Sequence, residues 1–306
     1  MRQRIFFIGL TIIGIIFILG IAFSDKSKEQ LQFLGIYRII GKVTQDANRS
    51  VPQLLFLKDE DEAKLKEYFK RYYAYQYTDP EQIKKQKYLE KLLKEIKPLA
   101  KRKLDYEIYL EPSIYPNAFA LPGGLILVTD GLLKTVKSES ELMAVIAHEL
   151  GHIERYHCID AVKFELAARK LKLDELGEIA DFANRLLIKH SYNKNQEDEA
   201  DEYSFELLTK TKYDPTSVAR AFNSLYQFYQ HEFDESKYSD PIRDYFRSHP
   251  PLDKRIDKFK SKAKQWWYLH SEKRYIGIRN LKEKIPYSEK DFGEKEYINK
   301  FQFIIE

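Results

Sequence analysis

The stretch that decides the fold is His148-Glu149-Leu150-Gly151-His152, or HELGH. It lies in an apolar helical pattern that follows Ser138-Glu139-Ser140-Glu141, and the Ser-x-x-Glu spacing there is typical of a capping box at a helix start. The pattern predicts a helix over about 138–156. On such a helix the two histidines are one turn apart on the same face, so both imidazoles can reach one metal ion.

Glu149 lies beside this histidine pair, where a carboxylate can serve as the general base for hydrolysis rather than as a metal ligand. A catalytic zinc takes three protein ligands, so a third His or carboxylate is required. We favour Glu197, because Asp201 follows it by one helical turn and can accept a hydrogen bond from the far nitrogen of a ligating histidine. Glu199 is the alternative ligand, but it lacks this relation to Asp201.

The composition limits the kinds of site and partner. Cys158 is the single cysteine, which excludes an intramolecular disulfide framework and cysteine-rich metal centres, so histidines and carboxylates must hold any metal. The 51 basic and 47 acidic residues leave a net charge of +4, and no basic motif accompanies it, so we expect no nucleic-acid partner. The 306 residues suffice for one large domain or two modest ones.

Helix and strand patterns alternate before the HELGH stretch. Residues 58–103 predict two charged amphipathic helices that are separated at Asp79-Pro80. Alternating apolar residues then predict a strand over 106–110. Residues 118–129 predict two strands joined by Pro122-Gly123-Gly124, whose glycines can take positive φ.

After the HELGH stretch the pattern is mainly helical. It continues to Leu187, resumes near Asn195 and restarts at Asp214-Pro215, where Asp can cap a helix and Pro suits its first turn. Beyond Trp267 it weakens into a basic tail with short apolar pieces, for which we expect a structural role. The sequence therefore predicts an α+β fold that is mostly helical, with a small β-sheet packed on the helices of the site.

An apolar segment precedes this soluble part. Residues 5–23 carry no charge over nineteen positions, which is long enough to cross a bilayer core of roughly 30 Å as a helix. We favour an uncleaved N-terminal transmembrane anchor. The alternative is a signal peptide, for which Gly20-Ile21-Ala22 is a passable cleavage site and which would leave a secreted protein.

The charges that flank this segment set the expected topology. Arg2 and Arg4 precede it and Lys26 and Lys28 follow it, which slightly favours a cytoplasmic N-terminus. The remaining chain would then lie outside the cytoplasm, in the periplasm or cell envelope.

Four separate stretches resemble the gluzincin family of metallopeptidases that includes HtpX, the periplasmic BepA and LoiP proteases, the mitochondrial Oma protease and the type 1 CAAX prenyl protease. They are HELGH, the Glu197–Asp201 segment, residues 117–124, and His249-Pro250 with Arg255. The resemblance implies a zincin-type core with one Zn²⁺ per chain, held by His148, His152 and Glu197 and supported by Asp201. One departure is Asn193-Lys194, where family members often have Ser-Arg.

The chain divides into four parts, of which the resemblance covers the core, and the resemblance extends the site. The parts are an anchor at 1–24, a charged helical region at 25–104, the metallopeptidase core at 105–270 and a basic tail at 271–306. The resemblance also places His249 near the metal, where an imidazole could stabilise an oxyanion or occlude the zinc. His157 lies about 140° round the helix from His152, so we expect a hydrogen-bonded structural residue there.

These observations predict a membrane-anchored zinc endopeptidase that acts on unfolded or misfolded proteins in envelope quality control. An extended substrate would pair with the backbone of Asn117, Ala118, Phe119 and Ala120 if that strand is a sheet edge. The alternative is a zinc-binding, membrane-tethered chaperone or assembly factor with latent protease activity. Glu149 favours the enzyme, since binding alone needs no general base.

Overall fold

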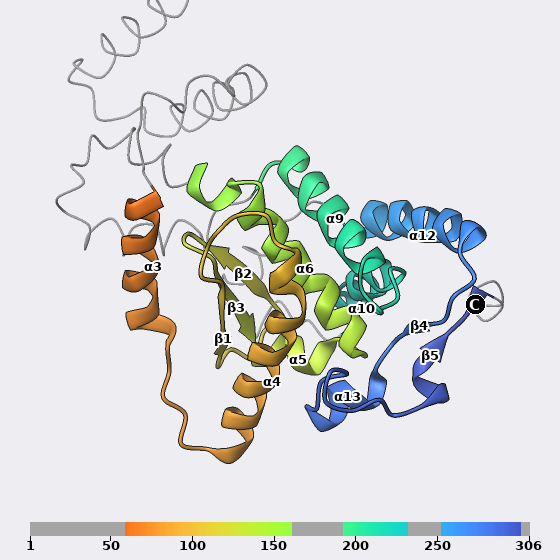
Figure 1. The fold of residues 1–306 in the computed structure, drawn as a ribbon, viewed down its shortest axis with the longest axis horizontal. Coiled ribbons are helices and arrows are strands. Elements are labelled where there is room, and N and C mark those ends of the chain that lie inside the picture. Colours follow the sequence, from red (N-terminus) through yellow and green to blue (C-terminus); the bar gives the residue numbers. More distant parts are fainter. Residues whose placement is uncertain (1–58, 161–191, 232–251, 301–306) are drawn as a thin grey trace, which may run out of the picture. The chain divides into compact units, whose positions relative to one another are not determined.

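A computed structural model describes residues 59–160, 192–231 and 252–300, which are coloured in Figure 1. The chain divides into two units, Met1–Phe56 and Leu57–Glu306, and every described residue belongs to the second. The expected anchor at 5–23, the helical pattern over 161–187 and His249 all lie outside the described residues. Within the described ranges, no helix combines the length and the apolar character that crossing a membrane requires.

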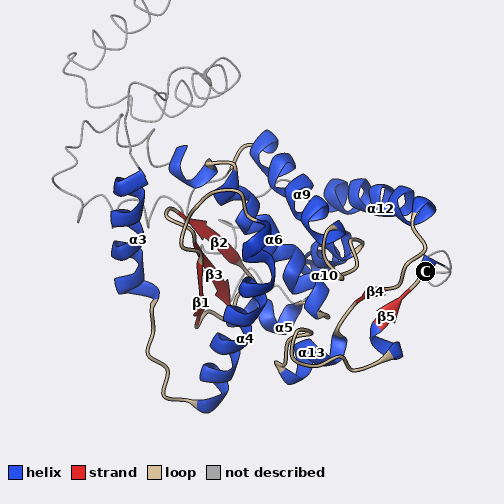
Figure 2. Cartoon of the chain, viewed as in Figure 1, coloured by secondary structure: helices blue, strands red, loops and turns tan. Residues whose placement is uncertain are grey.

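The described part of the chain is mostly helical with a small sheet, which confirms the predicted α+β class and is visible in Figure 2. The α-helices are α3 (Asp59–Tyr73), α4 (Pro80–Ile96), α5 (Asp130–Thr135), α6 (Glu139–Glu154), α9 (Lys194–Thr209), α10 (Ser217–His231), α12 (Leu252–Leu269) and α13 (Ile278–Glu283). The strands are β1 (Glu107–Glu111), β2 (Ala118–Leu121), β3 (Leu125–Thr129), β4 (Arg274–Tyr275) and β5 (Tyr297–Ile298). Short 3₁₀ turns lie at η2 (Lys97–Leu99) and η4 (Glu294–Glu296).

The starts of the helices follow the predicted caps. Asp79 caps α4 and Pro80 occupies its first position, which confirms the predicted break there. Ser138 caps α6 by accepting from the Glu141 N–H at 3.2 Å. The Glu141 carboxylate reaches back to the Lys137 N–H, one residue before the cap. α10 begins at Ser217, later than Asp214-Pro215 suggested.

The three-stranded sheet has the order β1-β3-β2, with β1 parallel and β2 antiparallel to β3. Gly123 and Gly124 in the β2–β3 turn have φ of 83° and 89°, as predicted. A side chain at Gly123 would also overlap Lys66 of α3, so this position requires glycine for space as well as for conformation. β3 is the central strand of this sheet, and every residue of it is buried.

Helix α6 lies between the sheet and the helices α9 and α10 (Figure 1). It contacts β2 and β3 on one side and α9 and α10 on the other, while α12 packs on α10 and α4 on β1. A core-facing set on α6 is almost completely buried: Leu142, Ile146, Leu150 and Ile153. The helix that carries HELGH is therefore the central element of the described core.

The C-terminal segment 274–298 packs on this core rather than extending from it. The Glu139 and Ser140 N–H groups at the start of α6 donate to the carbonyls of Gly277 and Ile276 at 3.0 and 2.9 Å. Tyr275 accepts in the same way from the Asp214 N–H at 3.0 Å. The bonds of Glu139 and Ser140 satisfy N–H groups that a helix leaves without an internal partner, so the segment closes the N-terminal end of α6.

Candidate metal centre

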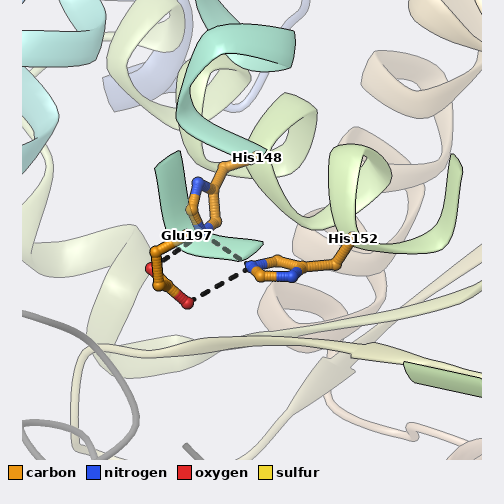
Figure 3. Close-up of side chains that lie close together, drawn as sticks. All are labelled: His148, His152 and Glu197. Atoms are coloured by element: carbon orange, nitrogen blue, oxygen red, sulfur yellow. Dashed lines mark hydrogen bonds and ion pairs between the residues drawn. The ribbon is translucent and has the colours of Figure 1, made fainter. Parts of the chain in front are cut away.

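His148, His152 and Glu197 lie together, as Figure 3 shows. The two histidines project from α6 and the carboxylate from the first turn of α9. The Nε2 atoms of the histidines are 3.1 Å apart. Oε2 of Glu197 is 3.6 Å from Nε2 of His148, and Oε1 is 3.4 Å from Nε2 of His152. All three side chains are buried.

These distances test whether the cluster fits zinc. Zinc bonds of 2.0–2.1 Å in a tetrahedron place neighbouring ligand atoms about 3.3 Å apart. The three separations, in which each histidine faces a different Glu197 oxygen, bracket this value. Two imidazole nitrogens and one carboxylate oxygen also form a donor set typical of catalytic zinc sites. The cluster fits a zinc ion in both geometry and chemistry.

A close approach of two helices brings the cluster together. A Cβ atom at Gly151 of α6 would lie 3.1 Å from the Ala200 Cα of α9 and as close to the Tyr203 Cβ, so a larger residue would push the helices apart. Ser204 of α9 stabilises the same helix–helix contact, because its hydroxyl donates to the Ala144 carbonyl of α6 at 2.7 Å. The small residues inside the two motifs therefore set the distance between their ligands.

Asp201 and Arg255 support His148 from behind. Asp201 Oδ1 lies 2.8 Å from His148 Nδ1. Arg255 of α12 donates to both Asp201 oxygens, at 2.9 and 2.6 Å, and its other terminal nitrogen is 3.3 Å from Glu197 Oε2. Burial would raise the pKa of Asp201, but the charge of Arg255 and the bond with His148 lower it overall, so the carboxylate is charged.

Glu149 is buried beside this cluster, with 4% of its surface exposed. Burial chiefly, and the Glu197 charge, raise its pKa to about 7, although His148, Arg255 and a backbone hydrogen bond with Ala120 oppose the shift. A carboxyl group with a pKa near neutrality can both accept and release a proton.

A pocket adjoins Glu149 and His148. Its apolar wall comes from α5, α6 and α10 and consists of Leu132, Ala144, Val145, Val218, Ala221, Phe222 and Leu225. Asn117, Ala118 and Arg255 complete the lining. The pocket places an apolar surface next to the two polar groups.

Strand β2 forms an edge of the sheet, since among the described strands it pairs with β3 alone. The Thr129 N–H donates to the Asn117 carbonyl at 3.0 Å, and the register continues through Phe119 and Leu127. Because bonding alternates in an antiparallel pair, the backbone groups of Ala118 and Ala120 face away from β3. The side of β2 that could accept another strand is the side next to Glu149.

A different set of groups surrounds His152. Its Nδ1 is 3.0 Å from Nδ1 of His157, and the Tyr192 ring stacks on its imidazole with 3.9 Å between the ring centroids. His157 thus bonds to His152 and is not one of the three residues of the cluster. The Glu199 carboxylate lies 3.5 Å from His157 and is half exposed, so the structure brings Glu197 rather than Glu199 to the two α6 histidines.

Two parts of the site were not identified in the sequence. The α10 residues of the pocket repeat with ordinary helical spacing, which core residues share, so no local signal marked them. Tyr192 precedes α9 and has no motif of its own. It lies next to Asn193-Lys194, where the sequence departs from the family pattern. Only the folded arrangement shows these residues at the site.

A family model described as "Peptidase family M48" matches residues 83–263, more than half of the chain. The chain belongs to peptidase family M48. Metalloprotease YcaL of Escherichia coli (strain K12) is 27% identical over 173 residues, which cover 52% of this chain and 62% of YcaL. Zinc is the metal of M48 metallopeptidases, in agreement with the fit of the cluster.

Two further relatives come from other organisms. Mitochondrial metalloendopeptidase OMA1 of Schizosaccharomyces pombe is 30% identical over 121 residues, 38% of this chain and 36% of OMA1. A putative beta-barrel assembly-enhancing protease of Vibrio cholerae is 28% identical over 172 residues, 49% of this chain and 33% of that protein. The M48 chain thus spans less than two thirds of the length of each relative.

Proposed function

We propose that this M48 chain is a membrane-anchored zinc endopeptidase that cleaves unfolded or misfolded proteins in the cell envelope. The observation that carries the proposal is the placement of a zinc-compatible cluster, a buried carboxyl group of raised pKa and a sheet edge around one pocket. A site that only bound proteins would need the edge and the pocket but no general base.

His148, His152 and Glu197 would hold the zinc, which when bound polarises a carbonyl oxygen and lowers the pKa of water. Asp201 fixes the tautomer of His148 by accepting from its Nδ1, so that Nε2 keeps its lone pair for the metal. Arg255 holds Asp201 in place and lies against Glu197, which sets the position of the third ligand.

Glu149 acts as the general base and acid. It accepts a proton as water attacks the peptide carbonyl and delivers it to the leaving amine. Its place in the pocket beside His148 brings it to the reacting bond.

The substrate would bind as an added strand along β2. The backbone groups of Ala118 and Ala120 on the side away from β3 would pair with an extended peptide, which would replace the bond between Ala120 and Glu149, while Asn117 and Phe119 keep their bonds to β3. Backbone pairing tolerates many sequences, but it requires an extended chain. Unfolded, misfolded or loop-exposing proteins meet that condition.

The location and one further residue belong to the same proposal. Residues 5–23 would anchor the chain in the membrane with the catalytic part outside the cytoplasm. Relatives named for beta-barrel assembly support a role in envelope quality control. We also place His249 in the active site, because Arg255, six residues later, contacts Glu197 and Asp201.

The test is cleavage of unfolded casein by the full chain, purified in detergent, beside Glu149→Gln. The wild type should cleave casein and lose this activity to a chelator, and Glu149→Gln should keep its zinc and lose cleavage. A variant that cleaves at the wild-type rate would contradict the role of Glu149. A wild type that binds unfolded protein without cleaving it would favour the chaperone.

A further inference from the structure

The Nδ1 atoms of the two HELGH histidines contact different groups. Asp201 contacts Nδ1 of His148, whereas Nδ1 of His152 faces another imidazole, that of His157, at 3.0 Å. A carboxylate or a carbonyl is the usual partner of the outer nitrogen of a ligating histidine. A histidine can take this place only if its nitrogen that faces His152 carries no hydrogen and can accept one.

The chain conformation brings His157 to this position. On a continued α-helix His157 would lie about 140° from His152 and could not contact its ring. α6 instead ends at Glu154, and Tyr156 takes the left-handed conformation, with φ of 64°. Few residues other than glycine adopt it. The turn directs His157 back against His152, where it is 4% exposed.

The geometry determines the direction of the hydrogen bonds. Nε2 of His152 faces Glu197 and His148, so this nitrogen is the one directed at the metal position. Its Nδ1 then carries the hydrogen and must donate to Nδ1 of His157. His157 consequently has its hydrogen on Nε2, which lies 3.5 Å from Oε2 of Glu199. Each nitrogen in this series has a partner of the right kind.

We propose that His157 is a positioning residue for the zinc ligand His152, acting through a relay from His152 to His157 to Glu199. It accepts at Nδ1, which fixes the tautomer and ring orientation of His152. The inference rests on the proposed function, because it requires a metal bound by His148, His152 and Glu197. It gives Glu199 a role at the outer end of the relay and not at the metal.

The experiment compares the zinc affinity of the wild type and three full-length variants in detergent, measured by competition with a chromogenic chelator. His157→Leu removes the acceptor and should weaken zinc binding about 10- to 100-fold. His157→Asn places an amide oxygen near the position of Nδ1 and should restore most of that loss. Glu199→Gln, at a half-exposed position, should have the smallest effect of the three.

Two further readouts separate positioning from general support of the fold. Circular dichroism of the metal-free proteins should show the same fold for His157→Leu and His157→Asn. The visible absorption of bound Co²⁺ should shift in His157→Leu and return in His157→Asn, since it reports the ligand geometry.

The outcomes distinguish this inference from the proposed function. Wild-type zinc affinity in His157→Leu would overturn the relay and leave the proposed function intact. Equal weakening in the Leu and Asn variants would also overturn it. A wild-type chain that binds no zinc would overturn both.

Discussion

Helix α6 carries two buried glutamates with the same pKa and different surroundings. Glu139 is at its N-terminal end and Glu149 lies ten residues later, and they are 0% and 4% exposed. Burial is the main cause that raises the pKa of each to about 7. A raised pKa alone would therefore mark both as candidate catalytic groups.

Their neighbours separate them. The Glu139 carboxyl group accepts from the Tyr88 hydroxyl at 2.8 Å, the Tyr213 hydroxyl at 2.9 Å and the Tyr287 N–H at 2.9 Å. Glu149 instead lines the pocket next to His148. Burial therefore sets the pKa of each carboxyl group, while access to a pocket decides whether the group can take part in a reaction.

The largest expected effect is on catalysis. Glu149→Gln should reduce cleavage of unfolded casein about 10³-fold, because the general base is lost. Glu139→Gln, the matched control on the same helix, should stay close to wild-type activity under conditions where it is folded. Initial rates measured at equal zinc content test the pair, and similar losses in both variants would remove the distinction.

The next effect is on stability. Glu139→Ala should lower the free energy of unfolding by on the order of 3 kcal/mol, because the Tyr88 hydroxyl and the Tyr287 N–H lose their acceptor and the Tyr213 hydroxyl keeps only Glu95. Urea unfolding at pH 6 measures it. Glu206→Ala on the exposed face of α9 is the control and should change stability by less than about 0.5 kcal/mol. A loss no larger than the control would show that the cluster around Glu139 does not stabilise the fold.

The stability of the wild type should depend on pH differently from that of Glu139→Gln. The pKa of Glu139 is about 7 in the folded chain and near 4.5 when unfolded, so the folded state holds the proton more tightly. This contribution is fully present below pH 4.5 and is lost as the pH rises through 7. Between pH 5 and 8 the wild type should lose about 2 kcal/mol more stability than Glu139→Gln. Parallel pH profiles would contradict the raised pKa.

The smallest effect comes from one hydroxyl group. Tyr213→Phe removes a single donor to Glu139 and should cost about 1 kcal/mol of unfolding free energy, with casein cleavage unchanged. Tyr226→Phe on α10, whose side chain is partly exposed, is the control. A change in cleavage with unchanged stability would link the Glu139 cluster to the active site.

Much of the site could be predicted because its signals are local. The spacing within HELGH and between Glu197 and Asp201 is one helical turn, so helix geometry alone places each pair on one face. The two glycines between β2 and β3 likewise predicted their own turn. Spacing by one helical turn is informative only for residues that lie within one regular helix.

The remaining features depend on contacts that no local pattern encodes. His157 reaches His152 because Tyr156 leaves the helical conformation, which reverses the expectation from a regular helix. Residues 274–298 read as a weak tail because β4 and β5 are two residues each, and their packing on α6 supplies the order. The α10 pocket wall has the same spacing as a core face.

The central claim is that His148, His152 and Glu197 hold one zinc ion that cleavage requires. The most direct test measures the metal content of the full chain beside His148→Ala and Glu197→Ala, with casein cleavage in the same samples. The account predicts about one zinc per wild-type chain, lost together with cleavage in both variants. Zinc retained in Glu197→Ala, or cleavage without zinc, would contradict it.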